Sequence, residues 1–186
     1  MIDYEAILAK YCAGNMDLLH ILLAHSRQVA DRALAILKAH PEWVESGEVD
    51  PVFVEEAAML HDIGVVLCDA PKIHCLGSHA YIEHGYLGAE ILRQEGLPRH
   101  AYVAERHTGT GITYEQIMRE QLPIPMQDYT PRTLEERLIC YADKFYSKTK
   151  LGEDKPMSKI RLHLWKYGSD TVQRFDEMRM LFEPNL

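Results

Sequence analysis

Apolar residues recur at helical spacing through most of this chain, whereas no run alternates apolar and polar residues for long enough to predict a strand. The clearest helix is expected at about residues 18–39, where Leu22 and Val29 belong to one apolar stripe. Asp17 is its expected N-cap and Pro41 its end. We therefore predict an all-α fold.

Turn and capping residues divide the rest of the chain into further expected helices. Asp50 followed by Pro51 opens the second helix, and Thr113 and Thr133 each begin a capping box. The remaining helices are expected at about residues 79–95 and 98–107, with two more beyond residue 157. Residues 65–78 show no clear period and are expected to form a loop.

Length, charge and cysteine content limit the class of protein and its partners. The 186 residues suffice for one hydrophobic core, and the net charge of −8 argues against a nucleic-acid duplex as partner. A small phosphorylated substrate remains compatible if bound metal ions supply positive charge. No signal peptide or membrane-spanning run is visible, and none of the four cysteines forms a C-x-x-C pair. We expect a cytoplasmic protein with free thiols and no membrane partner.

Ten histidines are the unusual part of the composition. His61 and Asp62 stand together at the end of the small and apolar run 57–60. A buried helix that ends in an imidazole and a carboxylate needs partners for both groups. A divalent metal ion would satisfy them, because both are metal ligands. A hydrogen-bonded pair that caps the helix is the alternative.

Four more residues are candidates, although each has an ordinary explanation when taken alone. His25 falls on the apolar face of its helix, where a satisfied core histidine is common. Asp143 lies among apolar neighbours and needs a metal or an ion-pair partner, because an unpaired buried charge is costly. His84 precedes a glycine, and His107 ends a helix just before a glycine-bearing turn.

Taken together, these residues resemble the HD-domain superfamily of metal-dependent phosphohydrolases, in its HDIG subgroup. The matching segments are HSRQVADRALAI from His25, LHDIG at 60–64, EHGYLGAEIL at 83–92, RHTGTG at 106–111 and YADK at 141–144. The resemblance covers about residues 20–150. The segments around His107 and Asp143 partly resemble the bacterial diadenosine tetraphosphate hydrolases of that superfamily.

The resemblance implies a single HD-domain helical bundle over residues 1–186, with a core at about 18–150 and a C-terminal extension at about 151–186. The metal site would lie in its centre. One metal would be held by His25, His61, Asp62 and Asp143, and a second by His84 and His107, with Asp62 as the bridge. Histidine-rich ligation favours Fe, Mn, Zn or Co over Mg or Ca.

The expected activity is hydrolysis of a phosphoric ester or anhydride in a small molecule, with a nucleotide as the favoured substrate. A hydroxide that bridges two divalent ions would attack phosphorus. Asp62 and Lys144 are the expected catalytic residues, Lys144 because it adjoins a ligand and could meet a phosphate. Many HDIG relatives carry a lysine after the motif, whereas Val65 stands here, so that position has no expected phosphate contact.

Three alternatives use the same residues. A few members of the superfamily share all six ligands and use a di-iron centre to activate dioxygen, so an oxygenase is one alternative. A nucleotide-binding module without catalysis is another. In a third, only the metal held by His25, His61, Asp62 and Asp143 is present. A homodimer also remains open.

Overall fold

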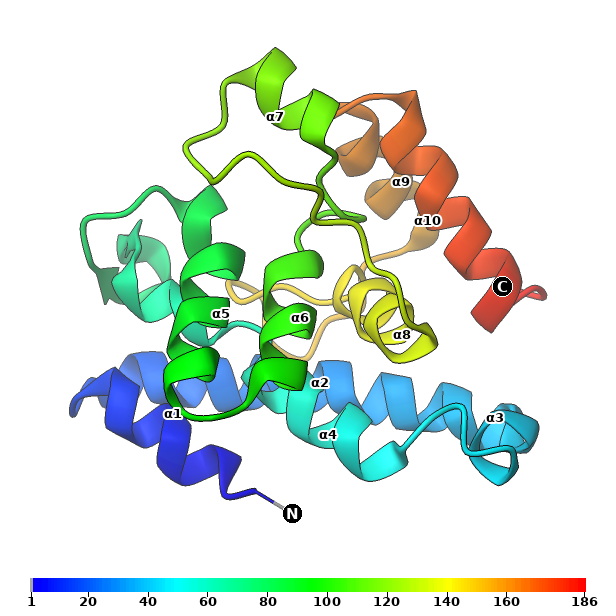
Figure 1. The fold of residues 1–186 in the computed structure, drawn as a ribbon, viewed down its shortest axis with the longest axis horizontal. Coiled ribbons are helices and arrows are strands. Elements are labelled where there is room, and N and C mark those ends of the chain that lie inside the picture. Colours follow the sequence, from blue (N-terminus) through cyan, green and yellow to red (C-terminus); the bar gives the residue numbers. More distant parts are fainter. Residues whose placement is uncertain (1) are drawn as a thin grey trace.

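The computed structural model describes residues 2–186, whose regular secondary structure is almost entirely helical (Figure 1). The α-helices are α1 (Tyr4–Cys12), α2 (Met16–Ala39), α3 (Pro41–Glu45), α4 (Pro51–Leu60), α5 (His84–Gln94), α6 (Pro98–Arg106), α7 (Tyr114–Glu120), α8 (Leu134–Asp143), α9 (Met157–Trp165) and α10 (Ser169–Phe182). The all-α prediction is confirmed. Among these described residues, no helix is both long and apolar enough to cross a membrane.

The segment between α4 and α5 is more ordered than expected. It contains three 3-10 helices, η1 (Ile63–Leu67), η2 (Pro71–Ile73) and η3 (Tyr81–Glu83). It also contains two short antiparallel strands, β1 (Asp69–Ala70) and β2 (Cys75–Leu76). A two-residue strand leaves no alternating pattern in the sequence, so the expectation of a plain loop at 65–78 was wrong in this detail.

The long helix α2 forms as predicted, but its N-cap is not Asp17. The side chain of Asn15 caps the helix, because its Oδ1 accepts a hydrogen bond from the backbone N of Leu18 at 3.1 Å. At the other end α2 stops at Ala39, and Pro41 opens the short helix α3 instead of only ending α2. Proline fits the first turn of a helix because no hydrogen bond is required of its nitrogen there.

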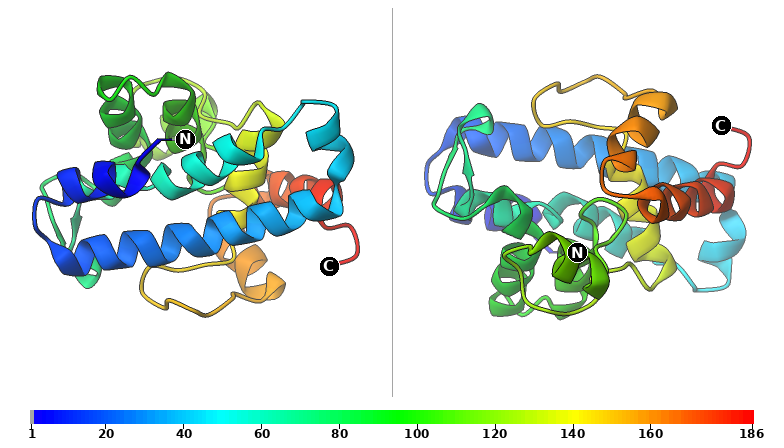
Figure 2. Two further views of the ribbon diagram at one scale, coloured as in Figure 1. Left: turned by 90° about the horizontal axis from the view of Figure 1, so that it is seen from below. Right: turned by 90° about the horizontal axis from the view of Figure 1, so that it is seen from above.

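The main core lies where α2, α4 and α8 meet (Figure 2). Ala33 of α2, Ala57 of α4 and Leu138 of α8 are fully buried there. Small side chains at such crossings let helices approach closely. The C-terminal helix α10 joins the same core, since the Phe175 and Phe182 rings lie 5.5 and 5.6 Å from Tyr141 of α8.

A glycine contact joins the end of α4 to α5. A Cβ atom on Gly64 would lie 2.0 Å from the backbone O of His84 and 2.4 Å from the backbone N of Gly88. Only glycine permits this approach. It places the chain that follows Asp62 directly against the first turns of α5.

Candidate metal centre

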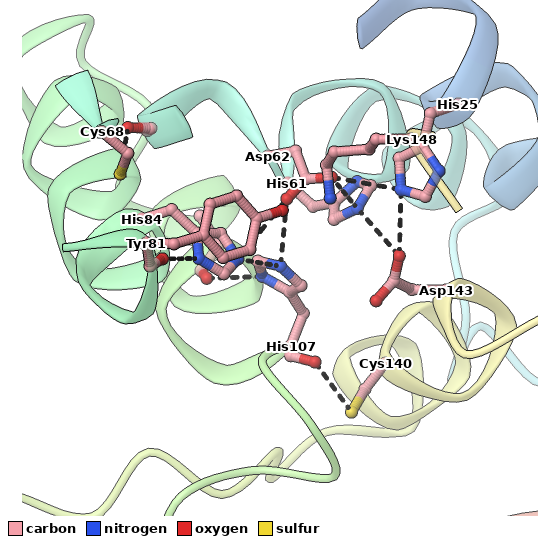
Figure 3. Close-up of polar contacts among 12 residues, drawn as sticks. His25, His61, Asp62, Cys68, Tyr81, His84, His107, Cys140, Asp143 and Lys148 are labelled. Atoms are coloured by element: carbon pink, nitrogen blue, oxygen red, sulfur yellow. Dashed lines mark hydrogen bonds and ion pairs between the residues drawn. The ribbon is translucent and has the colours of Figure 1, made fainter. Parts of the chain in front are cut away.

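Six polar side chains converge at the centre of the fold, where five helices meet (Figure 3). Ligand atoms of one group lie within 4.8 Å of one another, and the same holds for a second group. The first group is His25, His61, Asp62 and Asp143, and the second is Asp62, His84 and His107. The structure therefore brings together all six residues singled out from the sequence, with Asp62 common to both groups.

Most of these side chains come from helix ends. His61 follows the last residue of α4, His107 follows the last residue of α6, and Asp143 is the last residue of α8. His84 begins α5, and His25 alone projects from mid-helix, in α2. Helix ends leave side chains free to point beyond the helix into a shared space.

Backbone carbonyls fix the orientation of three of the imidazoles. The Nδ1 atoms of His61, His84 and His107 donate to carbonyl oxygens three residues earlier, at 2.6, 2.6 and 2.7 Å. A carbonyl can only accept, so Nδ1 carries the proton in each ring. In the neutral ring Nε2 is then unprotonated. It faces the cluster with its lone pair free to bind a metal ion, as metal-binding histidines require.

The two oxygens of Asp62 face different groups. Its Oδ2 lies 3.1 Å from Nε2 of His25 and 3.1 Å from Nε2 of His61. Its Oδ1 lies 3.5 Å from Nε2 of His84 and 3.4 Å from Nε2 of His107. A carboxylate placed in this way can serve one cation with each oxygen, which is the arrangement that a bridging ligand needs.

The nitrogen and oxygen atoms of the cluster are better suited to binding a metal ion than to hydrogen bonding with one another. Asp62 is 1% exposed, yet within residues 2–186 neither of its side-chain oxygens accepts a hydrogen bond of normal geometry, and Nε2 of His61 also has no hydrogen-bond partner. Buried polar atoms without hydrogen bonds are costly and call for an explanation. Imidazole nitrogens and carboxylates around one point are the donor set of a transition metal.

The electrostatics of the cluster keep most of these groups in a metal-binding form. Burial, and then His107, lower the pKa of His84 to about 3, and burial also lowers the pKa of His107. Against the effect of burial, neighbouring cations hold the pKa values of Asp62 and Asp143 well below their usual range. Burial would lower the pKa of His61, but the carboxylates beside it raise it to about 9. Binding of a metal ion at His61 would therefore release a proton.

A cavity of about 740 Å³ opens beside the cluster, with His25, His84, His107 and Asp143 on its wall. Residues from the segment between α4 and α5 also line it, among them Lys72 and Ile73. Further lining residues come from α9, α10 and the turn between them, namely Ile160, His163, Leu164, Tyr167 and Thr171. His163, which had no expected role, thus reaches the cavity.

Two lysines reach the cluster, and the sequence had pointed to only one of them. Nζ of Lys144 lies 2.7 Å from Oδ2 of Asp143 and donates to the backbone O of His107 at 3.1 Å. Lys148 was not predicted, although its Nζ lies 2.5 Å from Oδ2 of Asp62 and 5.8 Å from the centre of the Tyr81 ring. It follows the end of α8, where helical spacing no longer applies.

A family model for the HD domain matches residues 22–147. The chain belongs to the HD domain family. Membership points to metal-dependent hydrolase chemistry and agrees with the buried cluster of histidines and aspartates. Assignment to the HDIG subgroup, the number of metals and their identity stay predictions.

The chain is similar to several archaeal proteins. An uncharacterized protein of Methanocaldococcus jannaschii is 37% identical over 163 residues, which are 87% of this chain and 84% of that protein. Proteins named tRNA (cytidine(56)-2'-O)-methyltransferase from Picrophilus torridus and Thermoplasma volcanium are 35% and 32% identical over 77% and 74% of this chain. The matched parts are only 39% and 37% of those proteins. No solved structure matches the chain.

Proposed function

We propose that this protein is a metal-dependent phosphohydrolase that acts on a small phosphorylated molecule, with a nucleotide as the substrate class. The observation that carries the proposal is the position of Asp62. Its two oxygens face two groups of histidines, at the edge of a cavity that several lysines line. We do not propose methyltransferase activity, because this chain corresponds to well under half of the proteins with that name.

The donor set assigns a role to each side chain. His25, His61 and Asp143 would hold one metal, His84 and His107 the other, and Asp62 both. Bound divalent ions would lower the pKa of coordinated water and neutralise charge on phosphate oxygens. The chain itself supplies burial of the ligands and fixed imidazole orientations, so little reorganisation is needed during reaction.

Lys144 and Lys148 are the residues proposed to contact the phosphate. Both ammonium groups line the cavity beside ligands of the metal centre. An ammonium group binds a phosphate as a compact point charge with three donors. Lys148 stands against the bridging carboxylate, so its charge is available where negative charge develops during hydrolysis.

The apolar part of the cavity favours a substrate with an organic group. Ile112, Leu122, Ile160 and Leu164 line it together with the lysines. Small-molecule pockets in proteins usually have about 300–1,000 Å³, mostly apolar walls and a few well-placed polar groups. A phosphate at the metal end and a planar base against the apolar residues would match this division.

Release of orthophosphate from a panel of nucleotides and simple phosphomonoesters would test the proposal, with Mn, Co, Zn or Fe supplied. We expect turnover in the wild type and a loss of at least about 100-fold in His61→Ala. His20→Ala, an exposed histidine on the same helix as His25, is the matched control and should keep full activity. Absence of phosphate release with every metal would overturn the proposal.

The oxygenase alternative predicts that activity depends on dioxygen, whereas the hydrolase proposal does not. Hydrolysis should proceed at the same rate under nitrogen, because water is the only co-substrate. Activity that requires both iron and dioxygen, and stops under nitrogen, would select the oxygenase instead.

A further inference from the structure

Positive charge gathers on one side of the cavity, and the metal centre does not account for all of it. The basic wall consists of Lys144, Lys148, Lys155 and His163, all of which line the cavity. Three of these residues lie beyond the part of the chain that the HD family model matches, 22–147. Figure 2 shows the connection between α8 and α9, drawn in yellow to orange, on which all three lysines lie.

The three lysines differ in their partners. Lys144 and Lys148 each pair with a carboxylate of the candidate metal centre, at 2.7 and 2.5 Å. Unlike them, Lys155 forms no ion pair with a carboxylate among residues 2–186, and its Nζ donates to the backbone O of Lys144 at 3.3 Å. Its backbone N donates to the O of Phe145 at 2.7 Å, which fixes the loop against the end of α8.

The surroundings of Lys155 leave its charge poorly balanced. Burial lowers the pKa of Lys155, the charge of Asp143 opposes this, and the charges of Lys144 and Lys148 add to the lowering. Glu120 is the one other acidic residue on the cavity wall, and Lys72 adds another positive charge. Ammonium groups that gather in a partly buried space repel one another unless an anion lies between them.

Lys148 and Lys155 have different neighbours in the cavity. Lys148 contacts the bridging Asp62, so it belongs to the reacting end of the cavity. Lys155 contacts the backbone of Lys144 instead of any metal ligand, so it belongs to the next position along the wall. A second anionic group in the substrate would fill that position.

We propose that the basic wall is a second anion subsite, which holds a phosphate group other than the one attacked, so that the enzyme prefers substrates with two adjacent phosphates. This inference rests on the proposed function and specifies its substrate class. Lys155 is its central specificity residue, and the loop at 147–156 is the part of the chain that positions it.

Equilibrium binding of two non-hydrolysable probes would test the subsite. Methylenediphosphonate and methylphosphonate would be titrated by calorimetry into the manganese-loaded wild type, Lys155→Met and Lys159→Met. Lys159 is an exposed lysine of α9 and is the matched control, because its substitution removes the same charge without reaching the cavity. Methionine keeps most of the aliphatic stem of Lys155. Circular dichroism and metal content should match in all three proteins.

We expect Lys155→Met to bind the diphosphonate about tenfold or more weakly, as loss of a charge-assisted hydrogen bond implies. Its affinity for the monophosphonate should stay within about twofold of the wild type, and Lys159→Met should bind both probes normally. Chelation of the metal by the diphosphonate is common to all three proteins and therefore cancels. Equal weakening for both probes, no weakening for either, or no binding of the diphosphonate by the wild type would overturn the subsite.

The binding measurement separates this inference from the proposed function. A protein that shows the expected probe preference but releases no phosphate from any substrate would retain the subsite and lose the hydrolase proposal. A protein that hydrolyses phosphate esters while Lys155→Met leaves the probe preference unchanged would retain the hydrolase and lose the subsite.

Discussion

Asp62 is the residue on which both candidate metal positions depend, since each of its oxygens faces a different group of histidines. We expect about two metal equivalents per chain in the wild type, about one in His84→Ala and none in Asp62→Ala. Elemental analysis of protein purified without chelators or oxygen would measure this. His20→Ala should keep the wild-type content, and an unchanged content in Asp62→Ala would contradict the bridging role.

The buried thiols give a prediction about pH. All four cysteines are free and buried, and burial raises the pKa of Cys68 to about 12 and of Cys75 and Cys140 to about 11, from an ordinary value of 9.0. Between pH 9 and these values the folded state holds protons that the unfolded state has lost. Stability should therefore be intact below pH 9 and fall as the pH rises above it. Urea unfolding at pH 8 and pH 10 would show this as a lower midpoint at pH 10, and equal midpoints would contradict it.

Sequence reasoning singled out the six candidate ligands and Lys144 but missed Lys148 and Lys155, for a physical reason. His25 and His61 lie in or next to helices with clear apolar faces, and the family resemblance places them relative to one another. Lys148 and Lys155 lie in a loop, where no period predicts which way a side chain points. Their positions depend on tertiary contacts such as the hydrogen bond from Lys155 N to Phe145 O.

At the scale of single elements, two residues near the start of α2 are plausible N-caps of the helix. Asn15 caps the helix, whereas Asp17 is an exposed residue of its first turn. Asn15→Ala should lower the free energy of unfolding by about 1 kcal/mol. Asp17→Ala should cost less, because only a favourable interaction with the helix dipole is lost, about 0.3–1 kcal/mol. Chemical denaturation would measure both, and a larger cost for Asp17→Ala would restore it as the cap.

Substitution of Gly64 would test the close contact between the end of α4 and α5. A Cβ at this position would meet backbone atoms of His84 at 2.0 Å, so Gly64→Ala must push the two elements apart. Because Asp62 and His84 lie on the two sides of this contact, the variant should lose metal as well as stability. Gly47→Ala is a useful comparison, since Gly47 also resists substitution through its φ of +76° but has open space around it. It should lose about 1–2 kcal/mol of stability and no metal.

On the scale of the whole molecule, the C-terminal extension is part of the core. Phe182 is 2% exposed and lies 5.6 Å from the ring of Tyr141, two residues before Asp143. Phe182→Ala should lower the free energy of unfolding by about 3–5 kcal/mol, as for other large buried side chains. Met180→Ala, at an exposed position of the same helix, should stay near the wild type. Thermal unfolding would compare the two, and similar melting temperatures would argue against a structural role for α10.

The contact between His25 and Asp143 joins residues 118 positions apart in the chain. Such a distant pairing forms late when a protein folds, because the chain must first close a long loop. During synthesis the first five of the six ligands would leave the ribosome before Asp143, with only part of their coordination available. A metal captured at that stage would be held weakly and could exchange. Selection among the cell's metals would thus be deferred until α8 has been synthesised, docks and closes the site.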